Sequence, residues 1–126
     1  VANVLTIATN AQSGYAVTYN GATLTSGGNT ITPATIAADS DGTQGTEQFC
    51  LGVSTDGNAT IPSSYQRTAN GTSACNFAAS TTTTIVSETV PTAAETLSIS
   101  YLANISGTTE AGAYNTTLTY VATATY

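Results

Sequence analysis

The chain has 126 residues, enough for one domain with its own core, and only 6% of them are charged. An ordinary soluble domain has roughly 25% charged residues. The net charge is −6, and Arg67 is the only lysine or arginine. One basic residue cannot neutralise a run of phosphates, so the composition argues against nucleic-acid binding and against binding to an anionic lipid surface.

Hydroxyl and amide groups supply the polarity that charges do not. Threonine accounts for 28 residues, and it favours strands while placing a hydroxyl on the wetted face. Apolar residues reach 40%, which argues against disorder. This composition is typical of secreted bacterial or archaeal surface proteins, so we expect an extracellular or cell-surface location.

The first third of the chain predicts short strands. In residues 1–9, Leu5 and Ile7 alternate with Val4, Thr6 and Ala8, which indicates a strand. Residues 14–21 predict a second strand, and residues 22–32 a hairpin with its tip at 26–28. The chain starts without the basic and apolar regions of a signal peptide, so we expect that such a leader was removed or is not included.

The middle of the chain is less regular. Residues 34–44 are ambiguous, because a helical turn near Ile36 would stop within a few residues. Residues 48–55 predict a strand, 56–58 a turn and 59–72 mainly a surface loop. Shorter strands are expected at 73–77 and at 81–90, where Pro91 ends the second.

The last part of the chain has the longest alternation. In the region 95–126, apolar residues fall on every second position in 97–105 and, after Tyr114, again in 118–124, with a glycine-containing break between the two runs. This spacing predicts two strands that each bury one face, joined as an antiparallel hairpin. No apolar run approaches the roughly 20 residues that a membrane span needs.

These elements predict an all-β chain with seven to nine strands and turn signals about every 8–12 residues. The expected architecture is a single antiparallel β-sandwich of immunoglobulin-like build over residues 1–126. A closed barrel is the alternative.

The two cysteines, Cys50 and Cys75, indicate one disulfide formed in an oxidising compartment. A metal site is the alternative, but histidine is absent and no CxxC motif occurs. The bond would close a loop of about 26 residues and stabilise the fold by about 3–3.5 kcal/mol in the chain-entropy model.

No constellation of residues predicts catalysis. Without histidine or lysine, the serine–histidine, cysteine–histidine and serine–lysine arrangements cannot form. The acids are scattered, and tryptophan is absent as a platform for sugars. We therefore expect no enzyme and no cofactor.

One acidic stretch offers oxygen ligands for Ca²⁺, through Asp39, Asp41 and Glu47. Its spacing breaks off well short of an EF-hand loop. A solvated acidic turn without metal is the favoured interpretation.

Four Asn-x-Ser/Thr sequons occur, at Asn58, Asn70, Asn104 and Asn115. They are candidate glycosylation sites if the organism glycosylates its surface proteins. The predicted loops favour Asn58 and Asn70. Chance occurrence is the alternative in a chain so rich in asparagine and threonine.

Two stretches carry a family resemblance. Residues 110–121, EAGAYNTTLTYV, resemble the AGxY ending of secreted bacterial β-sandwich domains, including pilin-like and spore-coat-like ones. Residues 5–17, LTIATNAQSGYAV, followed by LTSGG at 24–28, are similar to the opening of small surface proteins of Patescibacteria such as Saccharibacteria. The resemblance implies an extracellular structural or adhesive protein, and it supplies no catalytic residues.

The leading functional hypothesis is a subunit of an extracellular filament or pilus that binds copies of itself. Residues 1–9 are the candidate donor strand, which would insert Leu5 and Ile7 into a neighbour while Val4 lies on the other face. The alternative is a monomeric adhesin or surface-layer domain, in which residues 34–45 and 59–72 contact a host cell or a surface glycan.

Overall fold

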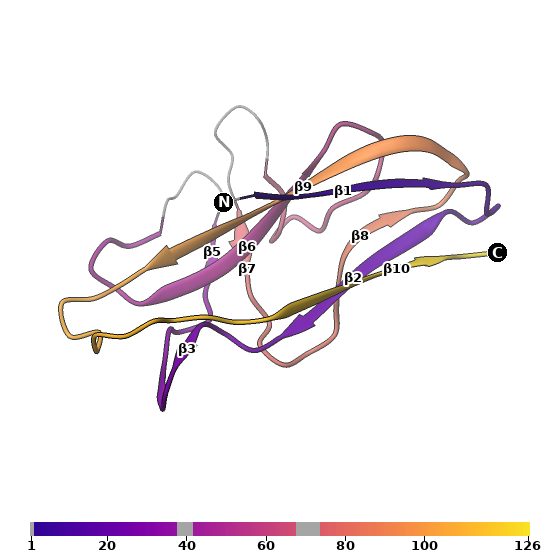
Figure 1. The fold of residues 1–126 in the computed structure, drawn as a ribbon. Coiled ribbons are helices and arrows are strands. Elements are labelled where there is room, and N and C mark those ends of the chain that lie inside the picture. Colours follow the sequence, from indigo (N-terminus) through magenta and orange to yellow (C-terminus); the bar gives the residue numbers. More distant parts are fainter. Residues whose placement is uncertain (1, 38–41, 68–73) are drawn as a thin grey trace.

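The protein is a two-layer antiparallel β-sandwich in its computed structural model, which describes residues 2–37, 42–67 and 74–126 (Figure 1). Five strands form one sheet in the order β1-β9-β6-β7-β5, and three form the other in the order β10-β2-β8. The ten strands in these ranges are β1 (Ala2–Thr9), β2 (Tyr15–Gly21), β3 (Thr25–Ser26), β4 (Asn29–Thr30), β5 (Thr35–Ile36), β6 (Gln48–Thr55), β7 (Cys75–Asn76), β8 (Thr83–Glu88), β9 (Thr92–Asn104) and β10 (Leu118–Ala124).

The predicted all-β sandwich is confirmed, and the described strands form separate sheets rather than the closed barrel that was the alternative. Four of the ten described strands have only two residues each, whereas the sequence predicted seven to nine strands. Residues 35–36, where a helical turn was the alternative, form the short strand β5. The immunoglobulin strand order stays a prediction.

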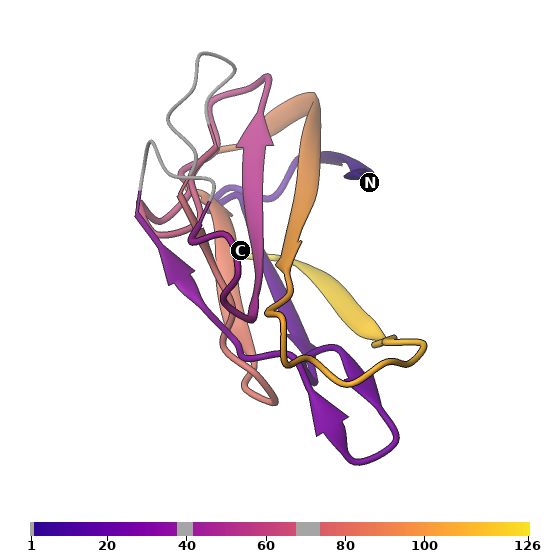
Figure 2. The same ribbon diagram turned by 90° about the vertical axis from the view of Figure 1, so that its left-hand side faces the viewer.

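The expected C-terminal hairpin is wrong. β9 pairs with β1 and β6 in the larger sheet, while β10 pairs with β2 in the smaller one. The connection from 105 to 117 is long enough to carry the chain from one sheet to the other, so the two regular strands face each other across the sandwich (Figure 1). The predicted hairpin at 22–32 does form, as β3 and β4, and projects from one end of the molecule (Figure 2).

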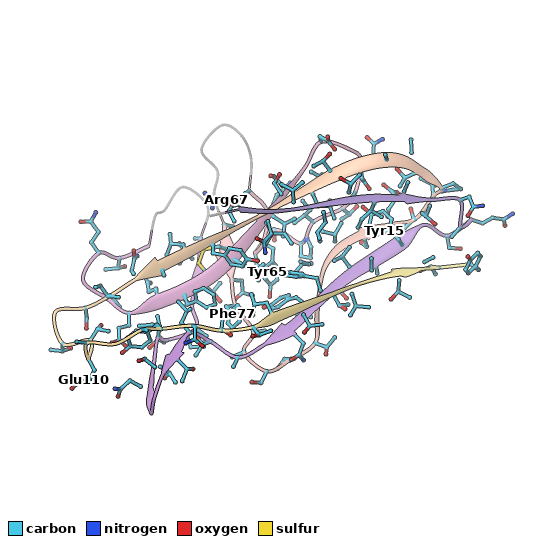
Figure 3. The ribbon with its side chains drawn as sticks, viewed as in Figure 1. Tyr15, Tyr65, Arg67, Phe77 and Glu110 are labelled. Carbon is cyan, nitrogen blue, oxygen red and sulfur yellow. A yellow bond between two sulfur atoms is a disulfide. The ribbon has the colours of Figure 1, made fainter. Side chains whose placement is uncertain are left out.

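The core lies between the two sheets and follows the alternation of the strands. Val17 and Tyr19 of β2 face Leu51, Leu97 and Ile99 of the larger sheet, and each is at most 1% exposed. Figure 3 places Tyr65 and Phe77 in the same interior. Tyr65 is only 3% exposed, so the segment predicted as surface loop contributes to the core.

The turn after β1 requires glycine. Gly14 has φ of +73°, and a Cβ atom there would lie 2.1 Å from the backbone oxygen of Glu88. The backbone N–H of Ser13 donates to the carbonyl of Thr125 at 3.1 Å, so this turn also binds the C-terminal end of the chain.

The predicted disulfide is present between Cys50 and Cys75, whose Cα atoms lie 5.4 Å apart. It joins β6 to its neighbour β7 within one sheet, whereas the immunoglobulin disulfide bridges the two sheets. Both cysteines are buried, so the bond joins β6 and β7 within the core.

We expect the variant Cys50→Ala/Cys75→Ala to lose about 3–3.5 kcal/mol of unfolding free energy, because the unfolded chain regains the freedom of the closed loop. Urea denaturation of the variant and the oxidised wild type measures the difference. The reduced wild type is the control and should unfold at the same urea concentration as the variant. An unchanged urea midpoint in both would contradict the prediction.

Candidate functional site

The most distinctive surface is the open side of the sandwich, where β1 ends one sheet and β10 ends the other (Figure 1). Edge strands expose unpaired backbone groups, and proteins usually protect them with charges, prolines or bulges. Neither Ala2–Thr9 nor Leu118–Ala124 contains a charged residue or a proline. Apart from an irregularity in β1 after Ile7, these two edges therefore lack the usual protection.

β1 is held mainly by β9. The register runs from Ala2 opposite Ser100 to Thr9 opposite Thr92, with an irregularity after Ile7. Leu5 and Ile7 are half-buried against the core, whereas Val4 is 62% exposed on the other face. The candidate donor strand therefore occupies a place in its own sheet and presents two apolar side chains inward.

A groove of about 530 Å³ lies between β9 and β10 on this open side. Phe49, Tyr101, Leu118 and Tyr120 contribute apolar surface, and Asn3 at the start of β1 lines it as well. β1 begins opposite Ser100 of β9, and β9 continues for four residues beyond that point. The groove lies alongside this extension of β9.

Tyrosine hydroxyls link the two sheets across this groove. The Nδ2 of Asn3 donates to the hydroxyl of Tyr101 at 3.0 Å, and the hydroxyls of Tyr101 and Tyr120 lie 2.7 Å apart. Burial, followed by the hydrogen bond with Tyr101, raises the pKa of Tyr120 well above its usual value. The described residues that line the groove are thus all uncharged.

A buried carboxylate, that of Glu95, lies at the other end of the sandwich. The hydroxyl of Tyr15 donates to Oε1 of Glu95, whose side chain is only 4% exposed. Thr55 donates to Oε2 of the same carboxylate at 3.3 Å. Burial, followed by the hydrogen bond to Glu95, raises the pKa of Tyr15 above its usual value. This contact ties β2 to β9 through the core.

The predicted calcium ligands are placed only in part. Asp39 and Asp41 lie outside the described residues, and Glu47 accepts a hydrogen bond from the hydroxyl of Thr109 at 2.6 Å. In the described ranges no group of three or more metal-binding side chains occurs.

The sequons differ in accessibility. Asn58 is exposed in the turn after β6, and Asn115 is exposed while its backbone pairs with Thr25. Asn104 is half-buried, and its amide donates to Oε1 of Gln48 at 3.3 Å. Asn70 lies outside the described residues. Asn58 and Asn115 are therefore the exposed sequons among the three described candidates.

Comparison of the chain with protein-family models, with curated proteins and with solved structures found no match. Within the described ranges there is also no helix long and apolar enough to cross a membrane.

Sequence reasoning missed the groove. Alternation placed Tyr101 and Tyr120 on inward faces, but the expected hairpin made their strands neighbours in one sheet. Their contact across the open side depends on the pairing of β10 with β2, for which the sequence carries no local signal.

We expect Tyr15, Tyr65 and Tyr120 to resist ionisation, because burial raises the pKa of each above the usual value of 10. A pKa that is higher in the folded state than in the unfolded chain stabilises the fold below pH 10. That stabilisation is lost as the pH rises above 10 toward the folded-state pKa. Absorbance at 295 nm, followed with near-ultraviolet circular dichroism, measures both events. Seven tyrosines that ionise together in the still-folded protein would contradict this.

We expect Tyr15→Phe to lower the unfolding free energy by about 1–3 kcal/mol, since it removes a hydrogen bond from a buried carboxylate. The matched control is Tyr126→Phe, because Tyr126 is 91% exposed and its change should stay within about 0.5 kcal/mol. Urea denaturation at neutral pH compares the two variants. Equal stability of both would show that the Tyr15–Glu95 contact does not stabilise the fold.

Proposed function

We propose that this protein is a structural subunit of an extracellular filament or pilus, assembled by β-strand complementation between subunits. The observation that carries the proposal is that β1 is an uncharged edge strand held mainly by β9, so the same strand of a neighbour could take its place. An edge without charges, proline or cover is the kind of surface to which another β-strand adds.

The strand exchanged in this proposal is β1. It attaches to the domain mainly through β9, and its inward side chains Leu5 and Ile7 would make the same contacts on the β9 of a second copy. Because the exchanged strand keeps the same register, the free energy of β1 on its own β9 should differ little from that of β1 on the β9 of a neighbour. A head-to-tail contact of this kind need not close, and it can therefore propagate a fibre.

The composition also supports an extracellular assembly. The disulfide persists in oxidising surroundings, and a surface of hydroxyl groups avoids burying charges between subunits.

The second candidate function is a monomeric cell-surface adhesin or surface-layer binding domain. The observation that favours it is the pairing of β1 with β9 of its own chain. With that strand in place the larger sheet needs no strand from a neighbour, and the loops and outer faces would bind the target.

A cysteine pair distinguishes the two functions. Val4 and Ser98 lie directly opposite each other on β1 and β9, and Val4 faces outward. In Val4→Cys/Ser98→Cys, an exchanged β1 would form the new disulfide between subunits, whereas a self-paired β1 would form it within one chain. We expect filaments of this variant to run as a covalent ladder on a non-reducing gel.

The single variant Val4→Cys is the matched control and should give no ladder of this length. Filaments that dissociate into monomers without reductant would exclude exchange of β1. Monodisperse particles in negative-stain electron microscopy, at all concentrations tested, would favour the adhesin.

Removal of residues 1–9 should abolish assembly and leave monomers, because the donor strand is gone. A synthetic peptide with the sequence of Ala2–Thr9 tests whether the truncated body still folds, since it should rebind beside β9 and restore the wild-type circular dichroism. Filaments formed by the truncated protein without peptide would contradict the proposed mechanism.

A further inference from the structure

Three of the four sequons lie in described residues, at Asn58, Asn104 and Asn115. N-glycosylation joins a sugar to the asparagine amide and requires the hydroxyl of the serine or threonine two residues further on. Because both groups belong to one segment, a folded sequon accepts a glycan where the asparagine and the hydroxyl residue are accessible together.

The sequon at Asn104 is closed by hydrogen bonds within the chain. Asn104 is half-buried, and its amide donates to Oε1 of Gln48 at 3.3 Å. The hydroxyl residue of this sequon is Ser106, whose Oγ lies 3.0 Å from the hydroxyl of Thr108 and 3.1 Å from that of Thr109. The amide and the hydroxyl that a transferase must reach are thus both engaged.

The other two described sequons are open. Asn58 is exposed in the turn that follows β6, and Thr60, two residues further on, is exposed as well. Asn115 and Thr117 are both exposed in the connection between β9 and β10. The backbone N–H of Asn115 donates to the carbonyl of Thr25 at 3.1 Å, which fixes the main chain while the side chain stays exposed.

The disulfide indicates the compartment in which N-glycans are added. The bond between Cys50 and Cys75 is of the kind that forms and persists in oxidising surroundings outside the cytoplasm. N-linked glycans occur on surface loops of secreted proteins. Glycosylation of the open sequons therefore requires the extracellular location of the proposed function, but it does not require the assembly of filaments.

Asn115 lies where a glycan would have a second effect. It lines the groove on the open side together with Tyr101, Leu118 and Tyr120. A bulky, solubilising group attached there would cover the apolar side chains of the groove and the start of β10. Because β10 contains neither a charged residue nor a proline, a glycan would supply protection that its sequence lacks.

We propose that Asn58 and Asn115 carry N-linked glycans while Asn104 stays unmodified, and that the glycan on Asn115 shields the groove. In the transfer step, Nδ2 of the asparagine forms a bond to the anomeric carbon of an oligosaccharide carried on a lipid pyrophosphate. The bond between that carbon and the pyrophosphate oxygen breaks, and the lipid pyrophosphate leaves with the electron pair. A base of the transferase takes one amide proton.

The test is mass spectrometry of glycopeptides from the protein secreted by its native cells. We expect glycans on the peptides that contain Asn58 and Asn115, and none on the peptide that contains Asn104. An unmodified Asn58 or Asn115, or a glycan on Asn104, would overturn the proposal. Filaments without these glycans would overturn it and leave the proposed assembly intact, whereas glycosylated monomers would support it and contradict the assembly.

Variants of the hydroxyl residue refine the test. Thr117→Ala removes the sequon but keeps Asn115, so the protein should lose the mass of one glycan. Thr117→Ser keeps the hydroxyl and should keep the glycan. The matched control is Thr119→Ala, because Thr119 is exposed nearby and belongs to no sequon. A glycan retained in Thr117→Ala, or lost in Thr119→Ala, would overturn the assignment.

The shielding of the groove is measured with an anilinonaphthalenesulfonate dye, whose fluorescence rises on apolar surface. The folded Thr117→Ala protein should bind about twofold more dye than the glycosylated wild type. Thr60→Ala, which loses the glycan on Asn58, is the control and should match the wild type, since Asn58 is not among the described residues that line the groove. Equal dye binding by Thr117→Ala and the wild type would overturn the shielding.

Discussion

The alternation of side chains along β9 is the constraint on which the rest of the structure depends. This strand runs from Thr92 to Asn104, pairs with β1 on one edge and with β6 on the other, and buries Leu97 and Ile99 completely. A shift of one residue would turn these side chains outward and the serines inward. The position of β9 therefore determines both the core and the outer face on which Ser100 lies.

The segment between β6 and β7 depends on this framework and on the disulfide. Tyr65 packs edge to face with Tyr19 of β2, their ring centroids 6.1 Å apart, and its hydroxyl accepts a hydrogen bond from Nδ2 of Asn76 in β7 at 3.1 Å. Tyr65 therefore contacts both sheets, while the bond between Cys50 and Cys75 joins β6 to β7. The same segment carries Arg67, so the packing of the core also positions the one basic side chain of the chain.

The strands and the disulfide could be predicted from the sequence alone. Residues 48–55 form a strand at the predicted bounds, and β2 buries Tyr15, Val17 and Tyr19 as their spacing indicated. Alternation is a local property, so it identifies strands and their inward faces. It does not identify partners, because β9 and β10 carry the same pattern as any strand that buries one face. The pairing of β10 with β2 and the burial of Tyr65 were decided by tertiary packing, where contacts between residues distant in the chain outweigh local pattern.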